Sequence, residues 1–341
     1  MSVESAPALF KVATLDLSRF KSSDQLEREA FARDLVDALK LDGFVKLVNH
    51  GISRAMIQDA LSISKKFFSL PDNVKRQIEH VPGPYPQRGW SRVGSESTAM
   101  LFGALEQSGK KITETDAKEH FDIGPPSDEQ FPNRWLDEAD VPSMKTYLED
   151  FFERCHGVSQ AILSAMEMAL ELPQGAFTDK CQGQSSELRF NHYPEASMSN
   201  APKDVSRVWP HTDLGVITCL FQDGVGGLEI ENRRCDGKFE AVDPNALDEL
   251  ILNISETMER WTNGVVKAGV HNVKLPPALK SSRQGGEELV IPERFSIPFF
   301  VKADRDTCVG PLEQFVSETR PPAYPPMTAL EYHVKRVAQA Y

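Results

Sequence analysis

The second half of the chain is a succession of short, β-rich segments separated by turn residues. They are residues 188–193, 215–221, 227–230, 249–254, 269–273 and 295–301. Short strands at this spacing are typical of an antiparallel sandwich or jelly roll. We therefore predict an α+β fold whose core is an antiparallel sandwich or a jelly roll. The Ser-, Gly- and Glu-rich stretch at 281–288 is expected to be an exposed insertion.

Helical periodicity marks the chain on either side of this strand-rich region. Apolar residues recur at helical spacing in a first helix, with Ser23 or Asp24 as its N-cap and Gly43 just past its end. They recur again in a second helix that Ser53 caps and Pro71 closes. A long helix is expected from about residue 142 to 172, with one apolar face that buttresses the sheet. A closing helix is expected within residues 327–341. The sequence thus predicts a jelly roll supported by helices, including one long helix.

Residues 80–134 show no clear periodicity. A loop of this length without secondary structure is typical of a lid or of disorder, and its aromatic and arginine content favours an ordered lid. We divide the chain into an N-terminal helical and strand region, residues 1–140, and a helix-buttressed jelly-roll core, residues 141–341. The two are expected to form one compact unit.

The overall composition excludes several classes of protein. The net charge of −12 argues against a nucleic-acid-binding surface, which needs clustered Lys and Arg. There is no apolar run near 18 residues and no signal-like N-terminus, so we expect no membrane partner. The five cysteines are scattered and never form a C-x-x-C pair, as expected for reduced thiols in a cytoplasmic protein. The oligomeric state is left open.

Three side chains suggest a metal centre. His211 and Asp213 are two residues apart, so on a strand they would point to one face, and His271 follows in a later segment. Two imidazoles and one carboxylate are the ligand set of the non-haem Fe(II) oxygenases. The spacing lets His211 and Asp213 reach one metal ion, and His271 is the candidate for the second imidazole.

A second constellation suggests a site for an anion. Alternation places polar side chains on one face of the strand at 188–193, namely Arg189, Asn191 and Tyr193. In the same way Arg294, Ser296 and Phe300 share a face of the strand at 295–301. An inward-facing arginine is costly unless an anion pairs with it, and a guanidinium matches a carboxylate in two-point fashion. We therefore expect a carboxylate clamp near the metal.

The order of these motifs resembles a known family. His211-Thr212-Asp213, then His271, then Arg294-Phe295-Ser296 is similar to the H-x-D…H…R-x-S signature of the Fe(II)/2-oxoglutarate-dependent dioxygenases. The closer resemblance is to the isopenicillin N synthase-like branch, including its fungal, thymine hydroxylase-like members. It extends over nearly the whole chain, through residues 41–51, 66–71, 87–90, 118–124, 220–228 and 261–264.

The resemblance implies that the core of the α+β fold is a double-stranded β-helix (jelly roll), and it implies a cofactor set and roles for particular residues. Fe(II) would be held by His211, Asp213 and His271. The cosubstrate 2-oxoglutarate would be bound by Arg294 and Ser296, with help from Tyr193 and Asn191. O2 would be the oxidant, and ascorbate is a candidate reductant. The implied reaction is oxidation of a C–H bond in a small metabolite by hydroxylation, desaturation or ring formation, with succinate and CO2 as co-products.

The chain also departs from the family pattern. Ser255-Glu256 stands where the family usually has Gly-Asp, and Asn272 follows the distal histidine where Arg is frequent. We expect these changes to alter local support rather than the metal ligands. Substrate selection is assigned to Arg88 and Trp90, to Phe300 and to the closing tail, with Arg88 as a partner for an acidic group of the substrate.

Other functions remain open at this stage. One is an Fe(II) oxidase of the same fold that does not use 2-oxoglutarate. Another is a non-catalytic jelly-roll protein that binds a small molecule. A Ser-His-Asp hydrolase is disfavoured because no Gly-x-Ser-x-Gly motif occurs in the chain. The leading hypothesis is a cytoplasmic oxygenase of secondary metabolism that acts on a small molecule.

Overall fold

Two sheets form the centre of the molecule. The computed structural model describes residues 11–81, 83, 85–99, 115–183, 185–197, 207–235, 237–243, 246–275 and 290–338. The larger sheet has the order β1 (Thr14–Asp16), β2 (Phe44–Val48), β11 (Leu250–Ile254), β8 (Ile217–Gln222), β14 (Arg294–Val301), β5 (Glu187–Tyr193), β4 (Glu119–Ile123) and β3 (Gly89–Ser91). The smaller sheet has the order β10 (Lys238–Ala241), β9 (Leu228–Asn232), β12 (His271–Val273) and β7 (Val208–His211). The short strands β6 (Ala196–Ser197) and β13 (Val290–Ile291) form a separate pair. Apart from the parallel pair of β1 and β2, the strands of both main sheets pair antiparallel, which confirms the predicted jelly-roll core with helices.

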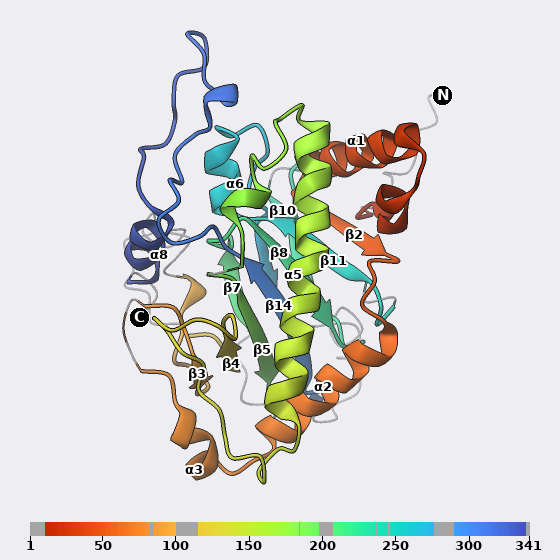
Figure 1. Cartoon of the computed structure of the whole chain (residues 1–341). Coiled ribbons are helices and arrows are strands. Elements are labelled where there is room, and N and C mark those ends of the chain that lie inside the picture. The colour runs from red at the N-terminus through yellow and green to blue at the C-terminus, as the bar shows by residue number, and fades with distance from the viewer. Residues whose placement is uncertain are drawn as a thin grey trace, which may run out of the picture.

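Helices cover the larger sheet on one face. The α-helices are α1 (Gln25–Asp42), α2 (Arg54–Phe68), α3 (Asp72–Lys75), α5 (Met144–Ala169), α6 (Glu256–Trp261) and α8 (Ala329–Val337). Short 3-10 helices are η1 (Leu17–Lys21), η2 (Arg76–Ile78), η4 (Thr178–Lys180) and η6 (Glu313–Phe315). In Figure 1, α5 runs along the length of the sheet with α1 near one end and α2 near the other. This is the buttress helix that the apolar periodicity predicts.

Helix boundaries follow local signals in the sequence. The Asp24 carboxylate accepts a hydrogen bond from the backbone N–H of Leu26 and caps α1. Gly43 ends the helix in the left-handed conformation, with φ of 81°, where a side chain would also strike the backbone of Gly269. Ser53 caps α2 through the N–H of Met56. These boundaries were predicted and are confirmed.

Apolar side chains form two clusters on the two faces of the larger sheet. Between the sheet and the helices, Phe152 packs edge-on against Phe299 with ring centroids 5.0 Å apart, and Phe67 lies 4.8 Å from Phe121. Burial of each such side chain stabilises the fold by roughly 1.5–3 kcal/mol. A smaller cluster lies between the two sheets and includes Val208. The cavity described below opens beside this second cluster.

Several expectations about the elements need correction. Residues 80–134 are not wholly loop, because β3 and β4 lie within them and extend the larger sheet. The strand β7 was not predicted, and Asp213 lies beyond its end rather than on it. The closing helix is α8 alone, shorter than 327–341. The expected insertion at 281–288 lies outside the described residues, and the division at residue 140 stays a prediction.

Within the described part of the chain, no helix is both long enough and apolar enough to cross a membrane.

Candidate metal centre and cavity

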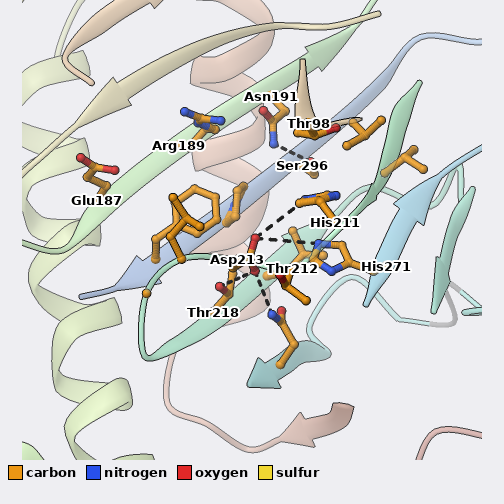
Figure 2. Close-up of a pocket in the computed structure, with 18 of the residues that line it drawn as sticks. Thr98, Glu187, Arg189, Asn191, His211, Thr212, Asp213, Thr218, His271 and Ser296 are labelled. Carbon is orange, nitrogen blue, oxygen red and sulfur yellow. Dashed lines mark hydrogen bonds and ion pairs between the residues drawn. The ribbon is translucent and has the colours of Figure 1, made fainter. Parts of the chain in front are cut away.

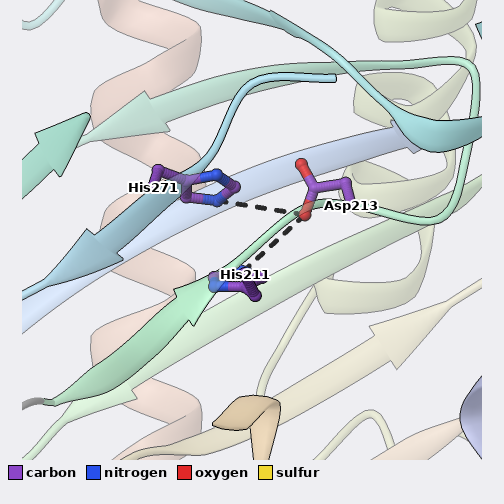
Figure 3. Close-up of side chains that lie close together, drawn as sticks. All are labelled: His211, Asp213 and His271. Atoms are coloured by element: carbon purple, nitrogen blue, oxygen red, sulfur yellow. Dashed lines mark ion pairs between the residues drawn. The ribbon is translucent and has the colours of Figure 1, made fainter. Parts of the chain in front are cut away.

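Strand pairing in the smaller sheet brings two histidines together. His211 is the last residue of β7 and His271 the first of β12, and the two are paired in register, with ring centroids 4.2 Å apart. Asp213 follows two residues after His211. Its Oδ1 lies 3.9 Å from Nε2 of each histidine, and one ligand atom from each residue lies within 4.8 Å of the others. Figure 3 shows the three side chains pointing toward one another.

Neighbouring groups orient the three side chains. Thr218 Oγ1 and Asn253 Nδ2 donate to Asp213 Oδ2 at 2.6 and 2.8 Å, so Oδ1 faces the histidines. The Nδ1 of His211 lies 2.8 Å from the Trp209 carbonyl oxygen, and the Nδ1 of His271 lies 3.3 Å from that of Gly269. A proton on each Nδ1 leaves Nε2 as the lone-pair donor, the usual arrangement around a protein-bound metal.

The electrostatics favour the metal-binding protonation states. Burial lowers the pKa of His211, and burial together with the charge of His211 lowers the pKa of His271 to about 4. Burial alone would raise the pKa of Asp213, but His271, His211 and the hydrogen bonds from Thr218 and Asn253 bring it below its usual value. At neutral pH the imidazoles are therefore neutral and the carboxylate is ionised. Metal ligands must be deprotonated in this way.

The predicted anion clamp lies on the wall of the same cavity. Arg294 is 1% exposed and its Nη2 donates to Gln222 Oε1 at 2.8 Å. Its Nε and Nη1 have no hydrogen-bond partner among the described residues. The guanidinium carbon lies 4.8 Å from the centre of the Tyr193 ring, and Asn191 Nδ2 donates to Ser296 Oγ at 3.3 Å. A buried cation with unused donors fits a carboxylate ligand such as one end of 2-oxoglutarate.

The structure separates the three residues that were predicted to contact substrate. Phe300 lines the cavity, 5.6 Å from the guanidinium carbon of Arg189. Arg88 and Trp90 do not line it. Arg88 is buried and donates to Glu187 and Asp128, each at 3.1 Å.

Trp90 has a supporting position instead. The residue is 1% exposed, and its indole N–H donates to Glu119 Oε2 at 2.6 Å. Arg88 likewise supports the cavity from behind: its guanidinium donates a hydrogen bond to Glu187, whose side chain lines the cavity. The expectation that Arg88 pairs with an acidic group of the substrate is therefore corrected, because protein carboxylates already occupy its guanidinium.

Charged side chains that were not predicted also line the cavity, among them Glu96, Lys118, Glu187 and Lys302. Lys118 and Arg189 both pair with Glu96, and Arg189 also pairs with Asp122 at 2.8 Å. Figure 2 shows Arg189 and Glu187 on one side of the cavity and the histidines on the other. The alternation of Lys118, His120 and Asp122 is the signal that could have indicated one polar face of a strand in this stretch.

The C-terminal helix completes the cavity. His333 and Val337 of α8 line it, as expected of the closing tail. The imidazole Nε2 of His333 is buried and has no hydrogen-bond partner among the described residues. Burial, followed by the nearby Lys302, lowers the pKa of His333 to about 3, so this side chain is neutral at physiological pH. Nothing in the periodicity of the tail singles out His333.

Two family models match the chain, and together they span most of it. Residues 184–303 match the 2OG-Fe(II) oxygenase superfamily. Residues 12–138 match the N-terminal region described as non-haem dioxygenase in morphine synthesis. The first match contains the two histidines, Asp213 and the Arg294 clamp.

Named relatives and solved structures agree with these matches. The chain is 46% identical to the 2-oxoglutarate-dependent dioxygenase phqC of Penicillium fellutanum, over 96% of this chain and 94% of that protein. It is 43% identical to the 2-oxoglutarate-dependent dioxygenase imqE of Aspergillus flavus, over 97% and 95%. The fold is similar to that of a full-length Neurospora crassa protein whose crystal structure contains alpha-KG. That match has a TM-score of 0.83 and 25% identity, and covers 98% of each chain.

Proposed function

Because this chain belongs to the 2OG-Fe(II) oxygenase superfamily and is an Fe(II)- and 2-oxoglutarate-dependent dioxygenase, we propose that it oxidises an unactivated C–H bond of a small metabolite. The proposed outcome is hydroxylation, desaturation or ring formation, with succinate and CO2 as co-products. We further propose that the reaction belongs to fungal secondary metabolism; the relatives phqC and imqE are 2-oxoglutarate-dependent dioxygenases of fungi.

One observation carries the proposal: a converging His-Asp-His cluster lines the same cavity as a buried arginine, two of whose nitrogens have no partner among the described residues. His211, Asp213 and His271 would hold Fe(II), and Arg294 would take the distal carboxylate of 2-oxoglutarate. Ser296, Tyr193 and Asn191 are proposed as further partners of the cosubstrate, since all of them line the cavity.

The chain's own residues then position the reactants. Thr218 and Asn253 hold one oxygen of Asp213 and thereby aim the other at the metal. Phe300 and Val337 supply apolar wall that excludes water from the reacting centre. When bound, Fe(II) with 2-oxoglutarate supplies the oxidising power, so the protein's task is to bind, orient and shield.

Neither alternative receives support from a particular feature of the cavity. An oxidase that does not use 2-oxoglutarate would have no evident use for the open donors of Arg294. A non-catalytic binding protein would have no need for three converging ligand atoms. Both are also disfavoured by relatives named as 2-oxoglutarate-dependent dioxygenases over nearly the full chain.

The first test does not require the substrate. Fe(II) and then 2-oxoglutarate are added anaerobically to the purified protein, and the weak visible charge-transfer band of the chelate is recorded. We expect the band in the wild type and its loss in His211→Ala, because the variant lacks one metal ligand. Iron binding without a band would favour the oxidase, and a protein that binds no iron would contradict the proposed catalytic centre.

A further inference from the structure

The carboxylate of Glu256 lies between the C-terminal helix α8 and residues 212–215, which carry Asp213 and are called the iron-binding loop below. Glu256 begins α6, and its Oε1 accepts a hydrogen bond from Thr212 Oγ1 at 2.6 Å. Thr212 is the residue between His211 and Asp213. The backbone N–H of Glu256 also donates to the carbonyl oxygen of Asp213 at 2.8 Å. Glu256 therefore holds this loop through both its side chain and its main chain.

The same carboxylate is bound by α8. Arg336 donates through Nη2 to Oε1 at 2.8 Å and through Nε to Oε2 at 3.1 Å, a two-point arrangement. The Tyr332 hydroxyl donates to Oε2 as well. The side chains of Arg336 and Glu256 are 21% and 15% exposed. The pair is thus more shielded from water than an ordinary surface ion pair, which contributes little.

The two ends of α8 have different attachments. Its first turn is fixed by a capping box between Thr328 and Glu331 and by the N–H of Ala329, which donates to the Thr307 carbonyl oxygen at 2.8 Å. Its later turns carry Arg336, and also Val337 on the cavity wall. Release of these turns would open the cavity while the first turn stayed anchored.

The iron-binding loop is also hydrogen-bonded to the next residue of α6. Thr257 donates from Oγ1 to the Leu214 carbonyl oxygen at 3.0 Å and from its N–H to the Gly215 carbonyl oxygen at 2.8 Å. Together with the two bonds of Glu256, these contacts tie residues 212–215 to α6. The Glu256 carboxylate itself contacts this segment through the Thr212 hydroxyl, one residue before Asp213.

We propose that Glu256 is a positioning residue that couples the docking of α8 over the cavity to the placement of the iron-binding loop. The inference rests on the proposed role of His211 and Asp213 as iron ligands. Coupling between two equilibria is reciprocal, so α8 docks more firmly when the loop holds iron, and the loop binds iron more tightly when α8 is docked. Closure of α8 then shields the loaded cavity from water.

The test compares variants that remove the contacts of Glu256 on either side: the hydrogen bond from Thr212 and the ion pair with Arg336. These two contacts are called the relay below. Thr212→Val removes the bond to the loop, Arg336→Met removes the pair with α8, and Lys335→Met is the control, since Lys335 is exposed on the same helix. The Kd for Fe(II) is measured anaerobically, and amide hydrogen exchange of residues 329–337 is followed with and without Fe(II). In the wild type and the control, Fe(II) is expected to slow this exchange severalfold.

Both relay variants are expected to lose this protection and to bind Fe(II) roughly tenfold more weakly. Because they cut one relay, the double variant should bind little more weakly than either single variant. Thr212→Ser keeps the hydroxyl and should retain the protection, which distinguishes coupling from local damage. Full Fe(II)-dependent protection in Thr212→Val would overturn the coupling. A wild-type protein that binds no Fe(II) would instead overturn the proposed function, and the inference with it.

Discussion

At the scale of single residues, Asp213 and Arg294 each use part of their hydrogen-bonding capacity within the protein and direct the rest toward a ligand. Asp213 uses one oxygen to accept from Thr218 and Asn253 and turns the other toward the histidines. Arg294 uses one nitrogen on Gln222 and keeps two without a partner among the described residues. A buried donor without a partner costs free energy. A ligand that supplies the missing acceptor recovers that free energy.

Arg294→Met is expected to weaken 2-oxoglutarate binding by about 10- to 100-fold, because charge-assisted hydrogen bonds to the distal carboxylate are lost. The apo protein should not lose stability, since a buried, incompletely paired cation is replaced by an apolar side chain. Titration of the anaerobic Fe(II) protein with 2-oxoglutarate measures the first effect and urea unfolding the second. Unchanged 2-oxoglutarate affinity would place the clamp elsewhere.

At the scale of elements, β4 shows why a periodicity of apolar residues can miss a buried strand. On β4, Glu119 accepts from Trp90, from Lys75 at 2.9 Å and from His192 at 2.8 Å. Hydropathy cannot reveal such a strand, because its buried side chains are charged and are satisfied by partners distant in the sequence. The amphipathic helices α1, α2 and α5 were predictable because the helical spacing of their apolar residues lies within each helix.

Trp90→Phe tests the supporting role assigned to β3. The variant keeps an aromatic ring but removes the donor to the buried Glu119, so the free energy of unfolding should fall by about 1–3 kcal/mol. Fe(II) and 2-oxoglutarate affinities should be unchanged, because Trp90 does not line the cavity. Urea unfolding and the anaerobic titration provide the two readouts. If the variant bound 2-oxoglutarate more weakly at unchanged stability, Trp90 would act on the binding site and not as structural support.

At the scale of the whole molecule, charges from separate parts of the chain meet at the far end of the cavity. Glu187 pairs with Arg88 and Lys302, and α8 adds His333 beside them. Burial opposes ionisation of Glu187, but Lys302 and Arg88 lower its pKa to about 2. Burial and Lys302 lower the pKa of His333 to about 3. Lowering the pH is therefore expected to destabilise the fold here, because the folded state disfavours protonation of both Glu187 and His333.

His333→Gln isolates the histidine. Unfolded His333 takes up a proton near pH 6.5, whereas folded His333 takes one up near pH 3, so its contribution to stability is present above pH 6.5 and is lost as the pH falls toward 3. The unfolding free energy of wild type minus variant should fall by about 1 kcal/mol between pH 7.5 and pH 5, a value reduced for partial exposure. Urea unfolding at the two pH values measures it, and a pH-independent difference would contradict the shifted pKa.

Local sequence patterns were sufficient to predict features that lie within one element or one short motif. Alternation placed Arg294 and Ser296 on one strand face, and the capping signals at residues 23–24 and at Ser53 marked the two helix starts. Three contacts could be seen only in the folded chain: His211 lies opposite His271 on paired strands, Arg88 pairs with Glu187, and Glu256 pairs with Arg336. The reason is physical: periodicity records which way a side chain points from its own backbone. Its partner depends on strand pairing and helix docking between segments far apart in the chain.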